Sequence, residues 1–127
     1  MSKHRIHRLG DLQLRIMKVL WERGKAAVSD VHEALGHAEF AYTTLATMLR
    51  KMEARGLVTH RAEGRSFVYK ASVAAEAVSR GMADHLVDRI FEGSLPDVVN
   101  HLLRTRDVSR EELAQLEKLI AERKRKL

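Results

Sequence analysis

The sequence predicts a mainly α-helical protein with one small β-hairpin. Apolar residues recur at helical spacing in three segments before Gly56, and they do so again from Val73 onward. Two short β-rich runs lie between these regions, joined by a turn with Gly64 at its tip. Three helices followed by such a hairpin form a winged helix-turn-helix domain, which we expect over residues 1–72. We expect residues 73–127 to form a separate helical domain.

Three helices precede the hairpin, and capping residues and glycines mark their ends. Asp11 is the expected N-cap of the first helix, which ends at Gly24. Ser29 is the expected N-cap of the second helix, and Gly36 is its C′ residue. The third helix is expected over Tyr42–Arg55.

The third helix is the most informative segment, because its two faces differ in chemistry. One face is an apolar stripe at positions i, i+3, i+4 and i+7, made of Leu45, Met48, Leu49 and Met52. The other face carries hydroxyls and cations, which can bond to phosphates and base edges in a DNA major groove. A solvated helix face is the alternative for this helix alone, and its neighbours favour DNA. The candidate DNA contacts of this recognition helix are Tyr42, Thr43, Thr44, Thr47, Arg50 and Lys51.

The hairpin adds a basic wing. Its strands are expected over residues 57–61 and 66–70, with the turn at residues 62–65. A hairpin in this position reaches the flanking backbone or the minor groove of DNA. The candidate wing contacts are His60, Arg61 and Arg65.

The positive charge of the chain lies entirely in its first part. The net charge is +6, residues 1–72 hold 13 Lys/Arg against 7 Asp/Glu, and residues 73–127 hold 10 of each. A polyanion is the natural partner for such a segment, although a generally soluble basic domain would have the same charge.

The tail is rich in aliphatic residues at helical spacing. Its first helix repeats them every four residues, at Val78, Met82, Leu86 and Ile90. Ser109 and Glu112 form a capping box that begins the last helix. The apolar face of that helix holds Leu113, Leu116 and Ile120. So many large aliphatics in a short tail favour burial against a second copy of the chain, and the alternative is that the tail covers its own domain.

The sequence also limits where the protein works. It has no cysteine, which excludes disulfides and thiolate metal sites. No apolar stretch approaches the ~20 residues that span a bilayer. The basic N-terminus lacks the apolar segment of a signal peptide. We therefore expect a cytoplasmic protein that does not insert into a membrane.

Motifs of catalysis are missing from the sequence. There is no G-x-G-x-x-G, P-loop or S-x-x-K string. The nearest approach to a metal motif is His32-Glu-Ala-Leu-Gly-His37. Its histidines are about 140° apart around a helix, so we expect them not to share a metal as H-E-x-x-H does. We expect no enzymatic activity, no metal and no cofactor.

In this order, the segments resemble the penicillinase-repressor family of bacterial transcription factors, BlaI, MecI and their relatives. The resemblance covers Leu9 to Leu119 and implies a winged-helix domain with a helical dimerisation tail. It further implies a homodimer that represses genes by binding palindromic operators. The matching pieces include Leu9-Gly-Asp-Leu12, Ala41-Tyr-Thr-Thr44, Leu49-Arg-Lys-Met-Glu-Ala-Arg-Gly-Leu57, the wing Glu63-Gly-Arg65, and Phe91-Glu-Gly-Ser-Leu95.

Two departures from the family concern the signal that releases DNA. Members that respond to β-lactams are cut at an Asn-Phe bond in the tail, where this chain reads Asn100-His101-Leu102-Leu103. Copper-responsive relatives carry a C-terminal cysteine cluster, which this chain lacks. The signal therefore stays open. Cleavage between His101 and Leu102, by a protease pathway that starts at a membrane sensor, is one candidate.

The sequence thus predicts a homodimeric repressor that binds specific double-stranded DNA. A winged helix can instead serve as a protein-interaction or RNA-binding module. Such modules often lack cations on the third helix and wing, where this chain has Arg50, Lys51, Arg61 and Arg65. A regulator that senses a small ligand in a pocket of its tail is the other alternative.

Overall fold

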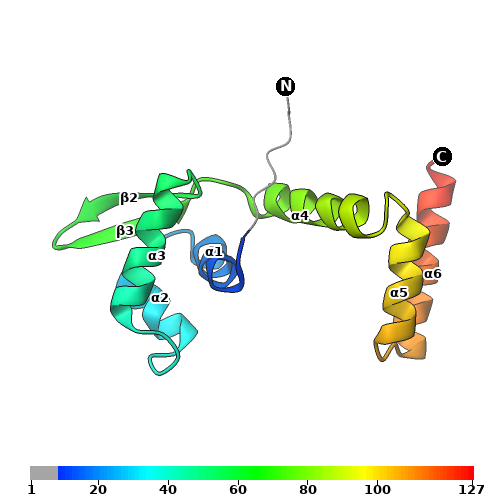
Figure 1. Cartoon of the computed structure of the whole chain (residues 1–127), viewed down its shortest axis with the longest axis horizontal. Coiled ribbons are helices and arrows are strands. Elements are labelled where there is room, and N and C mark those ends of the chain that lie inside the picture. Colours follow the sequence, from blue (N-terminus) through cyan, green and yellow to red (C-terminus); the bar gives the residue numbers. More distant parts are fainter. Residues whose placement is uncertain (1–8) are drawn as a thin grey trace. The chain divides into compact units, whose positions relative to one another are not determined.

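The computed structural model describes residues 9–127 (Figure 1). The chain divides into two compact units, one running to Asp84 and the other spanning His85–Leu127. A functional boundary at residue 72 stays a prediction, because compactness does not test it. The elements are α1 (Asp11–Arg23), β1 (Ala26–Ala27), α2 (Val28–Leu35), α3 (Tyr42–Ala54), β2 (Val58–Glu63), β3 (Ser66–Ala71), α4 (Ala75–Ile90), α5 (Leu95–Thr105) and α6 (Arg110–Arg125).

The wing hairpin is part of a three-stranded antiparallel sheet in the order β1-β3-β2. The hairpin was expected, but its strands are longer than predicted, and the turn is reduced to Gly64 and Arg65. Gly64 has a φ of +64°, which a residue without a Cβ adopts at little cost. Strand β1 was not predicted, because two alanines carry no strand signal; pairing with β3 alone defines it.

The core of the first unit lies between α1, α2, α3 and the sheet. The predicted apolar stripe of α3 points into it. Leu45, Leu49 and Met52 have no exposed surface, whereas Met48 is only partly buried at the edge. The other fully buried large side chains of this core cluster are Ile16, Met17, Leu20, Val31, Leu57 and Val58. This burial fixes which face of α3 remains exposed.

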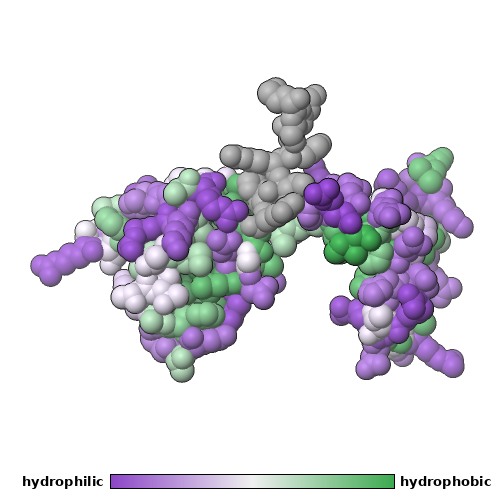
Figure 2. Space-filling model, in the orientation of Figure 1, coloured by the Kyte–Doolittle hydropathy of each residue, from purple (hydrophilic) through white to green (hydrophobic). Residues whose placement is uncertain are grey.

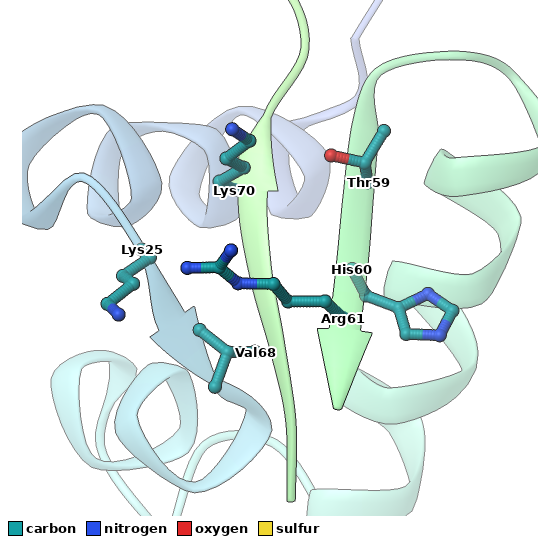
Figure 3. A pocket seen from close by; sticks show the side chains of 6 residues that line it. All are labelled: Lys25, Thr59, His60, Arg61, Val68 and Lys70. Atoms are coloured by element: carbon teal, nitrogen blue, oxygen red, sulfur yellow. The ribbon is translucent and has the colours of Figure 1, made fainter. Parts of the chain in front are cut away.

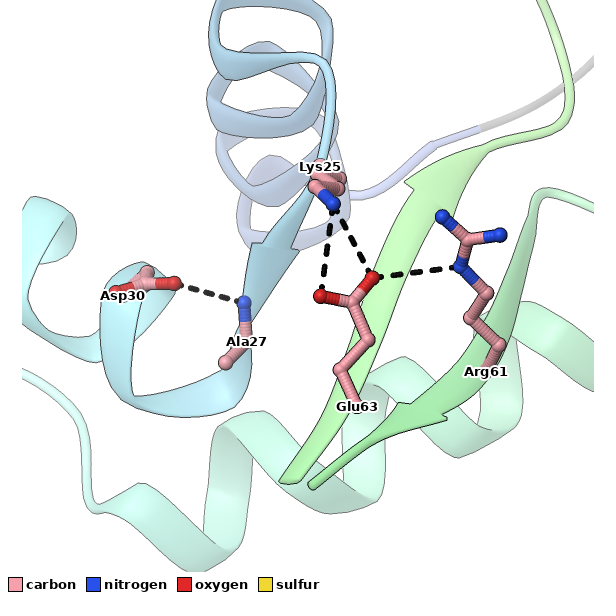
Figure 4. A network of polar contacts seen from close by, with 5 residues as sticks. All are labelled: Lys25, Ala27, Asp30, Arg61 and Glu63. Carbon is pink, nitrogen blue, oxygen red and sulfur yellow. Dashed lines mark hydrogen bonds and ion pairs between the residues drawn. The ribbon is translucent and has the colours of Figure 1, made fainter. Parts of the chain in front are cut away.

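Two predicted N-caps are wrong by one or two residues. Gly10, and not Asp11, is the N-cap of α1, and its backbone N–H donates to Gln13 Oε1 over 3.1 Å. Helix α2 follows directly on β1, so its N-cap is Ala27, whose N–H donates to Asp30 Oδ2 over 2.9 Å (Figure 4). Ser29 lies inside the first turn because strand pairing fixes the backbone up to Ala27.

The segment after β3 is bonded to the winged unit. The indole Nε1 of Trp21 donates to the carbonyl of Val73 over 2.9 Å. Further along, Val78 is 1% exposed in the single chain. The expectation that Val78 belongs to a surface shared between chains is therefore wrong, since its own chain already covers it.

The second unit has well-capped helices but little core of its own. Ser94 Oγ accepts from the backbone N–H of Asp97, and Ser109 with Glu112 forms the predicted capping box. Val98 is the one buried residue of α5, and α6 has none. Figure 2 shows hydrophobic surface at the C-terminal end of α4. The large apolar residues that stay exposed in this unit are Leu86, Ile90, Leu95, Val99, Leu102, Leu103, Leu113, Leu116, Leu119, Ile120 and Leu127.

Within the part of the chain that the structure describes, no helix has both the length and the hydrophobicity needed to cross a membrane.

Candidate DNA-binding site

The outward face of α3 carries the predicted recognition residues. All six are exposed: Tyr42, Thr43, Thr44, Thr47, Arg50 and Lys51. Arg50 donates from Nη2 to Thr47 Oγ1 over 3.2 Å, which holds the guanidinium against the helix. Three threonines, Met48 and Lys51 line a shallow depression on this face. Figure 2 shows near-neutral surface over the first half of α3 and hydrophilic surface toward its C-terminal end.

A groove separates α3 from the wing. Tyr42 and Arg50 line it from α3, and Arg65, Ser66 and Phe67 line it from the hairpin. Its mouth therefore combines two guanidinium groups with hydroxyl groups, the set that binds phosphate oxygens. Phe67 is 55% exposed beside this groove. Phe67 belongs to the wing motif that carries the family resemblance, but it was not among the predicted DNA contacts.

The segment that leads into α3 is held by contacts from α1 and α2. Arg15 on α1 forms a bidentate ion pair with Glu39, at 2.7 and 3.0 Å, and its guanidinium lies over the Phe40 ring. His32 Nε2 donates to the carbonyl of Phe40 over 2.9 Å. The Arg15 guanidinium holds the pKa of the Glu39 carboxyl below its ordinary value of 4.5. These contacts fix the start of α3, and sequence periodicity gave no sign of them.

The geometry expected for His32 and His37 is wrong. Their ring centroids lie 4.5 Å apart in an edge-to-face contact. The 140° separation holds only on a continuous helix, whereas α2 ends at Leu35 and the chain turns at Gly36, the expected C′ residue, which has a φ of +91°. Among residues 9–127, no group of three or more metal-ligating side chains gathers here or elsewhere.

The three predicted wing residues lie in different surroundings. Arg65 lines the groove with α3. His60 bonds to Glu53 of α3 through its Nδ1, at 2.6 Å. Arg61 lies in a small pocket whose lining also includes Lys25, Lys70 and His60, but its side chain and the His60 ring point in opposite directions (Figure 3). The structure therefore does not bring the three together as one contact surface.

A three-helix core, a basic hairpin and a third helix with exposed hydroxyls and cations define a winged helix-turn-helix protein. The sequence model of the penicillinase repressor family matches residues 9–122, and the chain belongs to that family. The resemblance noted from the sequence is thereby confirmed, and so is the expectation of a transcriptional regulator that is not an enzyme.

Relatives and a solved structure agree with this membership. The chain is 26% identical to the penicillinase repressor of Bacillus licheniformis over 121 residues, which are 94% of each protein. It is 31% identical to the transcriptional regulator BlaI of Mycobacterium tuberculosis over 121 residues, 89% of this chain and 88% of that one. The solution structure of the DNA-binding domain of the repressor BlaI is similar, with a TM-score of 0.50 and 28% identity. It covers 58% of this chain and 92% of that one.

The Arg15–Glu39 pair predicts a pH dependence of stability. Because the pKa of Glu39 is lowered in the folded protein, the pair stabilises fully above the ordinary value of 4.5. This contribution is lost as the pH falls through the lower folded value. Glu39→Gln should therefore unfold at a lower temperature than the unchanged protein at pH 7, and the gap should narrow below about pH 4.5. Thermal melts followed by circular dichroism across pH 3–7 test this, and a constant gap would contradict it.

Proposed function

We propose that this protein is a homodimeric repressor that binds a palindromic operator in double-stranded DNA. The observation that carries the proposal is the exposed face of α3, where threonines and cations lie beside a groove shared with a basic wing. Membership of the penicillinase repressor family supports it. Such a protein acts where the chromosome is, so we place it in the cytoplasm.

Each group on α3 has a role in this proposal. Thr43, Thr44 and Thr47 are short enough to let the helix backbone approach, and their hydroxyls bond to base edges or phosphates. Arg50 and Lys51 bind phosphate or guanine. A single winged unit makes few such contacts, so its affinity alone is modest.

The second unit provides the pairing surface. Its apolar residues remain exposed in the single chain, and α6 has no buried residue at all. A monomer with so many exposed large apolar side chains is unfavourable in water, so a second copy is the expected cover. Leu86 and Ile90 of α4 and the α6 stripe Leu113, Leu116 and Ile120 belong to the proposed surface. Pairing joins two half-sites about one helical turn apart, or a multiple of that spacing.

Cleavage between His101 and Leu102 as the releasing signal stays a prediction. Both residues lie inside α5. The His101 carbonyl accepts from Thr105 Oγ1 and the Leu102 carbonyl accepts from the N–H of Arg106. A protease needs an extended substrate, so α5 would have to unwind locally before a cut at this bond.

The double change Thr47→Ala with Arg50→Ala should abolish preference for the operator. Loss of base contacts costs about 1–3 kcal/mol of discrimination each, while the buried face of α3 is untouched. Gel shifts would compare the protein's own promoter, random duplex and structured RNA, with circular dichroism as the check of folding. Arg80→Ala, an exposed arginine paired with Glu76, is the matched control. Operator preference that survives the double change, or stronger binding to RNA, would refute the assignment.

Arg65→Ala should weaken specific and non-specific DNA binding by similar factors. A flexible cation at a hairpin tip contacts phosphate without reading sequence, and loss of one phosphate contact makes the log affinity against log salt slope shallower by about 0.9. Titrations between 50 and 200 mM salt measure this slope. A loss confined to one base position would show instead that the wing reads sequence.

Leu116→Asp with Ile120→Asp should convert the dimer into a monomer. Both side chains are exposed in the single chain, so charge there disturbs pairing more than folding. Sedimentation at micromolar concentration should give twice the chain mass for the unchanged protein and one chain mass for the variant. The variant should also lose tight operator binding. A monomeric unchanged protein would overturn the pairing proposal.

A further inference from the structure

A hydrogen bond between two side chains joins α3 to the wing. His60 on β2 and Glu53 near the end of α3 meet at 2.6 Å, through Nδ1 and Oε1. In Figure 3 the His60 ring points toward the neighbouring helix, whereas Arg61 points to the other side of the hairpin. Both partners of the pair are about one third exposed, at 33% and 31%. The pair therefore lies at the edge of the core, where water screens it only in part.

The His60 ring also contacts two rings of β3. Its centroid lies 5.3 Å from that of Tyr69, the residue that pairs with it across the hairpin, and 4.6 Å from that of Phe67. Tyr69 is buried and Phe67 is exposed. His60 thus lies between the buried and the exposed part of the hairpin. From β2 it contacts both α3 and β3.

A set of ion pairs holds the opposite face of the wing. Glu63, the last residue of β2, bonds to Lys25 Nζ at 3.1 Å and to Arg61 Nε at 3.3 Å (Figure 4). Its hydrogen bond with Lys25 lowers the pKa of the Glu63 carboxyl. Lys25 directly precedes β1, so the hairpin is held to the rest of the unit on both faces. Past these contacts lies the turn with Arg65.

The position of Arg65 depends on the angle of the hairpin. Four residues separate it from His60, and the strand from His60 to Glu63 is about 10 Å long at ~3.3 Å per residue, before the turn at Gly64 and Arg65. A rotation of about 10° at His60 moves the end of this strand by about 2 Å, enough to break a hydrogen bond to phosphate. A contact that fixes this angle therefore controls whether Arg65 reaches DNA.

His60 itself is poorly suited to bind phosphate. Its Nδ1 faces a carboxylate, which offsets any positive charge on the ring and repels a phosphate brought close to it. Resting on the proposed DNA-binding function, we propose that Glu53 and His60 form a positioning pair that sets the wing against α3. His60 then acts on DNA through Arg65, in place of the direct contact predicted from the sequence.

The test uses the full-length protein and a 30-bp random-sequence duplex, because wing contacts to phosphate do not depend on the operator. His60→Ala should weaken binding about three- to tenfold and make the salt slope shallower by about 0.9. In the Arg65→Ala background, His60→Ala should change affinity less than twofold, since the contact it positions is already gone. His60→Asn, whose amide N–H can replace the Nδ1 donor, should restore most of the affinity.

Changes at Glu53 should alter DNA affinity in opposite directions for the two possible roles of His60, direct contact with DNA and positioning of the wing. Glu53→Ala removes a negative charge near DNA, so direct contact by His60 would make binding tighter. If Glu53 positions the wing, Glu53→Ala should weaken DNA binding. This would happen even though the loss of a negative charge by itself favours binding to DNA. Glu53→Gln keeps an oxygen that accepts from Nδ1 and should bind at least as tightly as the unchanged protein.

Two results would overturn the positioning role: tighter binding by Glu53→Ala, or a loss from His60→Ala that is as large without Arg65 as with it. Thr59→Ala, a neighbouring change on β2, is the control for effects on folding, with thermal melts for every variant. Failure of the proposed function is a different result, in which the unchanged protein does not bind duplex DNA.

Discussion

The burial of one face of α3 is the constraint on which the proposed DNA-binding site depends. Leu45, Leu49 and Met52 are completely buried, and each such side chain contributes about 1.5–3 kcal/mol. Rotation of the helix about its axis would expose them, so the threonines and cations on the other side are held outward without any contact of their own. The Arg15–Glu39 pair then fixes where the helix begins, and the Glu53–His60 pair ties its far end to the wing. The exposed face of α3 is therefore held in place by the packing of the opposite face and by these two pairs.

Position in the sheet separates the functions of neighbouring wing residues. Side chains alternate between the two faces of a strand, so His60 points to α3 while Arg61 points away from it. Glu63 is on the same face as Arg61 and pairs with it, which offsets part of the basic charge there. Arg65 lies in the turn, outside this alternation, and it lines the groove with α3. One basic hairpin therefore carries an anchor for α3, an anchor for β1 and a candidate phosphate contact.

Local patterns were enough to predict the three helices of the winged domain, the hairpin, and the first and last helices of the tail, because a helix or strand with one buried face repeats apolar residues at a fixed period. Local patterns also predicted which residues of α3 are exposed. They could not give contacts between residues distant in sequence, such as Arg15 with Glu39 or Glu53 with His60. Strand β1 and the cap at Ala27 were missed for the same reason, since pairing with β3 decides both. Val78 was misassigned because periodicity identifies a buried face and not what covers it.

The second unit differs from the first in how its stability arises. Ser94, Ser109 and Glu112 cap its helices, yet caps contribute only about 1 kcal/mol each. Short helices with so little buried surface are marginal alone in water. Under the proposed pairing, the apolar surface that one chain leaves exposed is buried by the other, so pairing and helix stability reinforce each other. A signal that unwinds α5 would then weaken pairing as well, and DNA affinity would fall because two half-sites no longer bind together. Release therefore needs no change in the winged unit.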